Sequence, residues 1–193
     1  QGNQLVVRAE DITADRGQPR GKQYWERDSA SIFYTRTTGI WQTVWLEPVP
    51  ALRLADLRLT PLVESSSLHI RYEVAGDLQS AYEIETVVTF NGQPVTSATQ
   101  SVGGAGGAPS WGANLNEVTD SLSLAGSTPL ALWSPESPSL YDLTVRLKQN
   151  GSVIDEVQSY FGMRSVTIED GVFKLNGQPY YLKLVLDQGY NPE

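Results

Sequence analysis

The residues best placed for chemistry stand at the far end of the sequence. Asp187 and Gln188 follow Tyr180 to Leu186, a nearly continuous apolar run. Such a run is typical of a strand buried on both faces, as in a parallel sheet or barrel. Barrel enzymes place their active sites at the carboxyl-terminal ends of the strands, so both residues are candidate binding residues. The ordinary alternative is a solvated loop start.

Nucleophilic, metal and phosphate chemistry have little support. His69 is the only histidine and lies on the charged face of an alternating segment. A Ser-His-Asp mechanism would depend on this one imidazole, and no nucleophile-elbow motif accompanies it. The sequence contains no cysteine, which excludes thiolate ligands and disulfides. The Gly-rich run 103–107 lacks the Lys-Ser/Thr and the helix of a phosphate-binding loop. We therefore predict no metal site and no cofactor.

Tryptophans offer aromatic faces on which a sugar ring can stack. Trp41 and Trp45 are four residues apart, so a strand would place both on one face. Trp25 lies upstream of this pair. Packing in a core or a domain interface is the favoured interpretation for all three, because large aromatic side chains bury so much area. Trp133 is also interpreted as a core residue.

Strands and tight turns must position these residues. Leu68, Ile70, Tyr72 and Val74 alternate with polar residues, as in a strand with one buried face. Asn-Gly, the strongest short hairpin signal, occurs at 91–92, 150–151 and 176–177. Roughly seven strands follow within about 110 residues, with no helical segment. We predict an all-β fold, an immunoglobulin-like antiparallel β-sandwich, although the Cys-Trp-Cys pattern of antibody domains is missing.

The first 48 residues are organised differently. Strand-like pieces occur at 5–7, 31–35 and 41–46, separated by a long polar loop. Three short strands are a poor basis for an independent domain. The segment 47–50, Glu-Pro-Val-Pro, has the composition of a linker.

Composition excludes some partners. Hydrophobic residues make up 40% of the 193 residues and charged residues 19%, which is ordinary for a globular protein. The net charge of −8 argues against nucleic acid or an anionic membrane as a partner. No run approaches the roughly 20 apolar residues of a membrane helix. The absence of cysteine is compatible with the cytoplasm.

Three motifs, in this order, resemble glycoside hydrolase family 2, the β-galactosidase and β-glucuronidase family. Residues 36–48, RTTGIWQTVWLEP, resemble the closing strand of its sugar-binding jelly roll. Residues 132–147, LWSPESPSLYDLTVRL, resemble the approach to the last strands of its immunoglobulin-like domain. Residues 161–190, beginning FGMRSVTIEDG, resemble the entry into its (β/α)8 catalytic barrel.

The resemblance implies a division of the chain into three parts. Residues 1–48 would be the C-terminal part of the jelly roll, 49–162 the sandwich, and 163–193 the start of the barrel. Family members hydrolyse glycosides with retention, using two Glu residues on later barrel strands; retention needs two carboxyl groups about 5–5.5 Å apart. That pair would lie beyond Glu193. We therefore expect this chain to be a non-catalytic, accessory part of a larger enzyme.

The resemblance also implies binding residues in the intact parent. Asp11 sits where the family's sugar-binding domain sends an acidic residue to the active-site mouth, although Asp is also a common loop starter. Gln188 aligns with a position that touches the substrate in some members, where it is a different residue type. Asp187 stands beside it. The implied partners are a carbohydrate and the remaining jelly roll and barrel.

Two other functions stay open at this point. One is a stand-alone carbohydrate-binding module that uses Trp25, Trp41 or Trp111. The other is an adhesion or scaffolding domain unrelated to sugars. If the chain is instead part of a larger enzyme, the segments that flank the sandwich lack their partners, so we expect them to be disordered, or to pair with the sandwich or with a second copy, giving a homo-oligomer.

Overall fold

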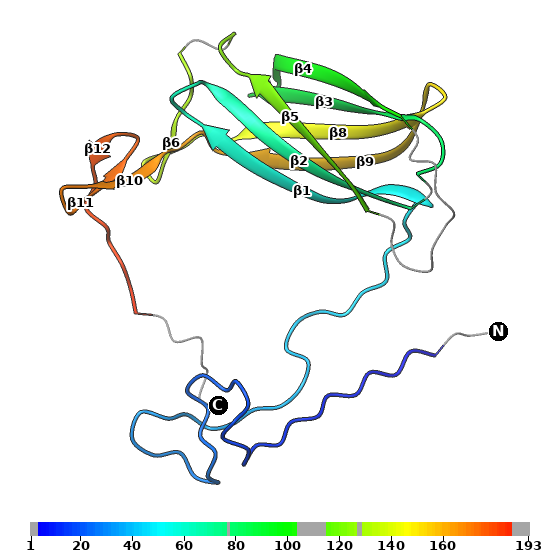
Figure 1. Cartoon of the computed structure of the whole chain (residues 1–193). Helices are drawn as coiled ribbons and strands as arrows, with labels where there is room; N and C mark the ends of the chain where they lie inside the picture. Colours follow the sequence, from blue (N-terminus) through cyan, green and yellow to red (C-terminus); the bar gives the residue numbers. More distant parts are fainter. Residues whose placement is uncertain (1–3, 77, 104–114, 127–128, 187–193) are drawn as a thin grey trace. The chain divides into compact units, whose positions relative to one another are not determined.

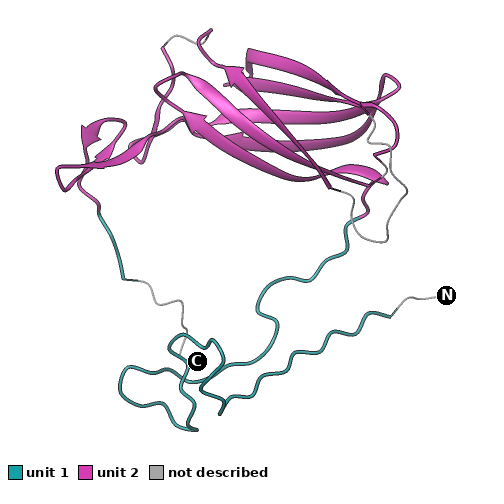
Figure 2. Cartoon of the chain, in the orientation of Figure 1, with its two compact units in different colours: residues 1–47, 183–193 teal, residues 48–182 magenta. Residues whose placement is uncertain are grey.

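The computed structural model describes residues 4–76, 78–103, 115–126 and 129–186 (Figure 1). The chain divides into two compact units, residues 1–47 with 183–193, and residues 48–182 (Figure 2). All strands of the described residues belong to the larger unit, and these residues form no helix.

Two antiparallel sheets build the larger unit. The first is four-stranded, in the order β4 (Gln93–Val102), β3 (Tyr82–Phe90), β8 (Tyr141–Gln149), β9 (Ser152–Phe161). The second is three-stranded, in the order β1 (Leu52–Leu62), β2 (Ser67–Gly76), β5 (Leu115–Ser123). The sheets lie face to face (Figure 1), and their inner faces supply one hydrophobic core. The predicted all-β, immunoglobulin-like sandwich is confirmed.

Alternation along the strands decides which side chains form this core. The four apolar residues predicted to share one face of β2 are all buried: Leu68, Ile70, Tyr72 and Val74. His69, between two of them, is exposed as expected. In β8 the same pattern buries Tyr141, Leu143, Val145 and Leu147. Period-two burial is what a sheet with one solvated face requires.

Left-handed turns join the hairpins. All three predicted Asn-Gly turns have positive φ at both residues, with the asparagines between 50° and 52° and the glycines between 75° and 77°. They connect β3 to β4, β8 to β9 and β11 to β12. Asp170-Gly171, with φ of 52° and 76°, forms a fourth turn of this kind. Positive φ at both central positions matches the twist of the paired strands.

A small meander follows the sandwich. It consists of β10 (Val166–Glu169), β11 (Val172–Leu175) and β12 (Gln178–Pro179). A two-stranded tongue, β6 (Trp133–Ser134) with β7 (Ser137–Pro138), contacts it. The Asn176 side chain donates to the Trp133 carbonyl at 3.0 Å, and its own oxygen accepts from the Ser165 backbone at 3.0 Å. One asparagine therefore fastens the meander to the tongue.

The strands expected on either side of the sandwich are not strands in the structure. Residues 5–7, 31–35 and 41–46 have no ladder, and an isolated bridge between Gln23 and Tyr34 is the regular pairing described there. The apolar run 180–186 is likewise without a partner strand, and Val185 is 89% exposed. A strand needs a neighbour for its backbone groups, and the described residues offer none to these segments.

Candidate functional site

Asp11 lies in the wall of a polar hollow within residues 1–47. The hollow has a volume of about 310 Å³. We call it the Asp11 hollow; its lining includes Asp11, Thr13, Gln18, Arg20, Gln23 and Arg36. Nearly all of these side chains are polar, so the hollow suits a ligand that exchanges hydrogen bonds with the protein.

A tight turn brings two sides of the hollow together. The Asp15 backbone donates to the Ile12 carbonyl at 2.9 Å, and the Asp15 carboxylate accepts from the Gly17 backbone at 2.8 Å. Side-chain bonds of this kind favour turns over extended structure. The returning chain places the Gln18 amide against Asp11 and against the Ile12 carbonyl, the latter at 3.0 Å.

Three aromatic side chains downstream of this turn pack together, and one of them contacts the turn through Arg16. Tyr24 and Phe33 stack with their ring centroids 5.1 Å apart, and Trp25 meets Phe33 edge-on at 4.9 Å. The Arg16 guanidinium lies 4.2 Å above the Trp25 ring. Aromatic and cation–π contacts of this kind contribute stability in addition to that from the apolar surface they bury. The packing interpretation of Trp25 is therefore confirmed.

Hydrogen bonds keep the Asp11 carboxylate charged. Gln18 donates to one carboxylate oxygen, and the Thr38 hydroxyl donates to the other at 2.9 Å. These two bonds, with a smaller contribution from the Arg20 charge, lower the pKa of Asp11, while partial burial opposes them. Bonds to the charged form favour that form. Asp11 is therefore an ionised acceptor at neutral pH.

This arrangement is suited to binding rather than to acid catalysis. A general acid must carry a proton near neutral pH, and a carboxyl with a lowered pKa does not. Asp11 is also the only acidic side chain among the described residues that line the hollow. Each carboxylate oxygen has two lone pairs, so Asp11 can accept further hydrogen bonds from ligand hydroxyls.

Metal and membrane features are not found in the described part of the chain. No group of three or more His, Asp or Glu side chains there is placed to hold a metal ion. None of its segments is a helix long and apolar enough to cross a bilayer.

The other candidate residues have different outcomes. Asp187, Gln188 and Trp111 lie outside the described residues. Trp41 is 87% exposed and Trp45 is 72% exposed, so neither belongs to a core formed by the described residues. Their segment has no partner strand among those residues, and packing in a domain interface stays a prediction.

The side chains that orient Asp11 were not predictable from sequence spacing. Gln18 is seven residues away and Thr38 is 27 residues away, and neither spacing matches a strand or helix period. The available signal was composition: the polar loop after Asp11 is rich in turn formers, which bring distant side chains together.

Comparison with known proteins gives a consistent result. The family model for glycosyl hydrolases family 2 matches residues 52–164. A β-galactosidase from Leuconostoc mesenteroides is 29% identical over 160 residues, which is 81% of this chain and 15% of that protein. A putative β-glucuronidase from Formosa agariphila is 29% identical over 148 residues, 75% of this chain and 17% of that protein.

A solved structure agrees. The crystal structure of a glycosyl hydrolase family 2 member from Bacteroides cellulosilyticus superposes with a TM-score of 0.60 at 26% identity. The match covers 70% of this chain and 17% of that one. This chain thus spans less than a fifth of the length of the relatives named here.

Proposed function

Because this chain belongs to glycosyl hydrolase family 2, we propose that it is a non-catalytic, accessory part of an enzyme that hydrolyses O-glycosidic bonds. The relatives that it resembles are β-galactosidases and a putative β-glucuronidase, which supports a β-galactoside or β-glucuronide as substrate. The proposed reaction proceeds with retention, through two carboxyl groups that belong to the rest of the enzyme.

The single observation that carries this proposal is the Asp11 hollow. It presents one ionised carboxylate with its hydrogen-bond donors already in place. Retaining hydrolysis needs a second carboxyl group about 5–5.5 Å from the first, one of them protonated. A single carboxylate with a lowered pKa supports recognition of sugar hydroxyls and does not support bond cleavage.

Each part of the chain has a proposed role. Residues 1–48 present Asp11 to the substrate as part of a sugar-binding domain. Residues 49–162 form the sandwich that separates this domain from the catalytic barrel. Residues 163–193 begin the barrel, and Asp187 and Gln188 stand at the rim of its first strand. The rigid antiparallel core supports the role of a spacer, because interlocked sheets resist bending.

Turnover of a chromogenic galactoside or glucuronide tests the proposal. The 193-residue chain is expected to show none, and the same chain with the flanking protein restored is expected to turn over one of the two. In the longer protein, Asp11→Asn should lower kcat/KM about tenfold or more, because a charged hydrogen-bond partner of the substrate is lost. Glu26→Gln, an exposed acid in the same loop, is the matched control. Turnover by the 193-residue chain alone would overturn the proposal.

A further inference from the structure

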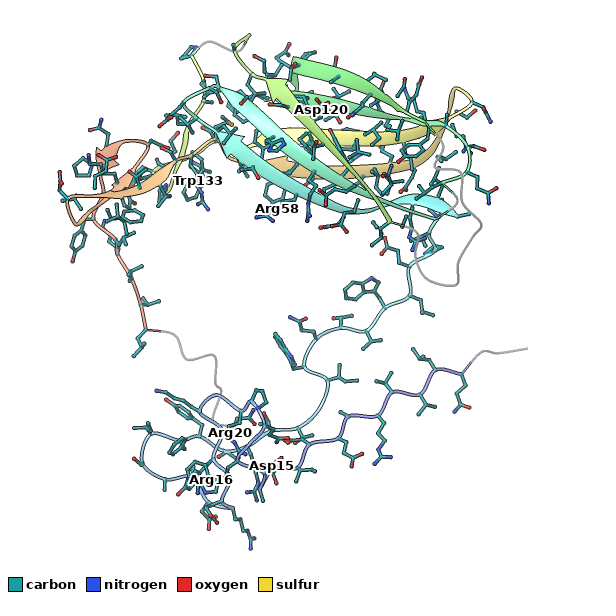
Figure 3. All side chains as sticks on the ribbon, in the orientation of Figure 1. Asp15, Arg16, Arg20, Arg58, Asp120 and Trp133 are labelled. Carbon is teal, nitrogen blue, oxygen red and sulfur yellow. The ribbon has the colours of Figure 1, made fainter. Side chains whose placement is uncertain are left out.

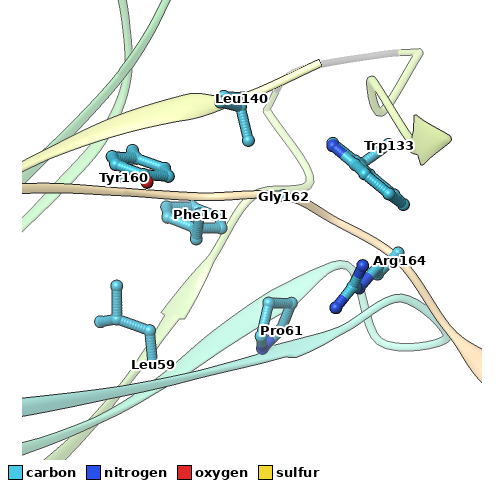
Figure 4. A pocket seen from close by; sticks show the side chains of 8 residues that line it. All are labelled: Leu59, Pro61, Trp133, Leu140, Tyr160, Phe161, Gly162 and Arg164. Atoms are coloured by element: carbon cyan, nitrogen blue, oxygen red, sulfur yellow. The ribbon is translucent and has the colours of Figure 1, made fainter. Parts of the chain in front are cut away.

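A cleft at one end of the sandwich has no role so far. It has a volume of about 440 Å³, within the range of small-molecule sites. We call it the Trp133 cleft (Figure 4). Trp133 and Arg164 form one side, Tyr160 and Leu59 face them across the hollow, and Pro61 lies between the two sides. All of these residues belong to the larger unit.

The Trp133 side of the cleft is built rigidly. A Cβ on Gly162 would lie 3.0 Å from the Trp133 side chain, so the backbone that follows β9 packs directly against the indole. The Trp133 backbone donates to the Met163 carbonyl at 2.9 Å, and Asn176 donates to the Trp133 carbonyl at 3.0 Å. The Arg164 guanidinium lies 4.7 Å from the centre of the Trp133 ring. Trp133 is thus held in place before any ligand arrives, with the Arg164 guanidinium lying over its ring.

Arg164 keeps its hydrogen-bonding edge available. Arg164 is exposed, and among the described residues no carboxylate pairs with its guanidinium. A guanidinium is a planar fork that can bind a carboxylate through two parallel hydrogen bonds. The cleft therefore has one cation, placed over Trp133, whose donors can bind a ligand carboxylate.

Tyr160 supplies an exposed aromatic surface. It is 66% exposed, although Phe161 beside it is buried and stacks on Tyr141 at 5.2 Å. Leu140, also in the lining, is 42% exposed. An exposed aromatic ring on a paired strand suits the C–H face of a hydroxyl-bearing ring such as a pyranose chair.

We propose that the Trp133 cleft binds a uronic acid unit of an acidic saccharide. The carboxylate pairs with the Arg164 fork, and the C–H face of the pyranose packs on the Tyr160 ring. The ligand class rests on the proposed function, since a carbohydrate-processing enzyme meets such saccharides. The charge complementarity is independent of it, because Arg164 is exposed in the cleft without a carboxylate partner among the described residues, and a carboxylate on the ligand can form a charge-assisted pair that a neutral sugar cannot.

A titration of the 193-residue chain, followed by amide and indole NMR signals, tests this site. Digalacturonic acid is the probe and galactobiose its neutral counterpart. The acidic disaccharide is expected to shift the Gly162 amide and the Trp133 indole N–H in a saturable way, with at least tenfold tighter binding than the neutral one. No saturable shift, or equal binding of both disaccharides, overturns the proposal.

Substitutions at two arginines distinguish specific binding at Arg164 from nonspecific attraction of the acidic saccharide to positive charge. Arg164→Gln should weaken digalacturonate binding about tenfold or more, whereas Arg58→Gln, an exposed arginine on the outer face of β1 (Figure 3), should leave it within about twofold. Arg164→Lys keeps the charge and loses the fork, so its affinity should lie between those of the wild type and Arg164→Gln. Equal loss at both arginines contradicts a site at Arg164. Unchanged amide spectra outside the cleft show that each variant is folded.

Two further results discriminate the alternatives. A short peptide with a free C-terminal carboxylate that binds as tightly as digalacturonate overturns the saccharide assignment in favour of a protein partner. The turnover experiment is separate, because it depends on carboxyl groups outside this chain. Turnover by the extended protein without uronate binding removes only the cleft proposal, and uronate binding without turnover removes only the hydrolase proposal.

Discussion

The hydroxyl groups of Tyr72 and Thr86 lie 2.7 Å apart in the middle of the sandwich core. Tyr72 is on β2 and Thr86 on β3, so this hydrogen bond joins the two sheets. Both side chains are about 1% exposed. A buried hydroxyl without a hydrogen-bond partner destabilises the fold, and here each hydroxyl is the hydrogen-bond partner of the other. The sheets are therefore aligned by a directional contact as well as by apolar packing.

Removing one partner of this pair should destabilise the sandwich more than removing both. Thr86→Val leaves the Tyr72 hydroxyl buried without a partner and should lower the free energy of unfolding by about 1–3 kcal/mol. The double variant Tyr72→Phe/Thr86→Val removes both polar groups and should lose less than Thr86→Val alone. Urea denaturation followed by fluorescence measures both values. A double variant less stable than either single variant would contradict the pairing.

The same pair predicts a loss of stability at alkaline pH. Burial raises the pKa of Tyr72 from 10.0 to about 12, with the Asp120 charge adding to the effect and the bond to Thr86 opposing it. Above pH 10 the unfolded chain releases this proton while the folded chain retains it, so ionisation favours unfolding. The contribution is complete below pH 10 and is lost between pH 10 and 12. Denaturation curves across this range should show a weaker pH dependence in Tyr72→Phe than in the wild type.

Asp11 should show the opposite behaviour at acid pH. Bonds from Gln18 and Thr38 lower its pKa below 3.8, so the contribution of the ionised form is present above that value and is lost as the pH falls through the lowered pKa. Thr38→Val should raise the pKa of Asp11, measured by carbon-detected NMR of the carboxyl group. Thr37→Val is the control, because Thr37 bonds to Gln23 and not to Asp11. An unchanged pKa in Thr38→Val would show that the Thr38 bond is not formed in solution.

Local patterns predicted the sandwich because its strands are amphipathic and its turns are chemically specific. Alternation at Leu68, Ile70 and Tyr72 identified one buried face, and Asn-Gly pairs identified hairpins through their positive φ. Hydrophobicity alone misled at residues 41–46 and 180–186. An apolar segment becomes a strand only where another strand satisfies its backbone, and sequence composition does not report whether that partner is present.

The surroundings of the candidate sites were not predictable in the same way. Asp11 was identified through a family resemblance, but Thr38 reaches it from 27 residues away along an irregular chain. Arg164 and Trp133 meet because the segment between β9 and β10 pairs with the start of the tongue, which is a consequence of tertiary packing. Tertiary side-chain contacts of this kind produce no periodic pattern in the sequence, whereas amphipathic strands produce an alternating one.

At Gly76, tertiary packing and not a local sequence pattern determines which residue type is tolerated. Its φ is 117°, and a Cβ there would lie 1.7 Å from the Ala51 carbonyl oxygen. Gly76→Ala should therefore lower the free energy of unfolding by several kcal/mol, because strain and a backbone clash combine. Gly92→Ala, at φ 75° with open space around the added methyl, should cost only about 1 kcal/mol. Thermal denaturation compares the two, and equal losses would contradict the clash.

Asn176 should control how firmly the meander is fastened to the tongue. Asn176→Gly keeps a residue that tolerates its φ of 52° and removes both side-chain bonds, to the Trp133 carbonyl and from the Ser165 backbone. We expect amide hydrogen exchange in β10 to β12 to become about tenfold faster or more, while exchange in β3 and β8 stays unchanged, because only the local attachment is weakened. Asn150→Gly is a matched control at an equivalent turn, with φ of 50° and no side-chain bond among the described contacts. If exchange in β8 and β9 accelerates as much in Asn150→Gly as exchange in β10 to β12 does in Asn176→Gly, glycine at the turn, and not loss of the two side-chain bonds, accounts for the change.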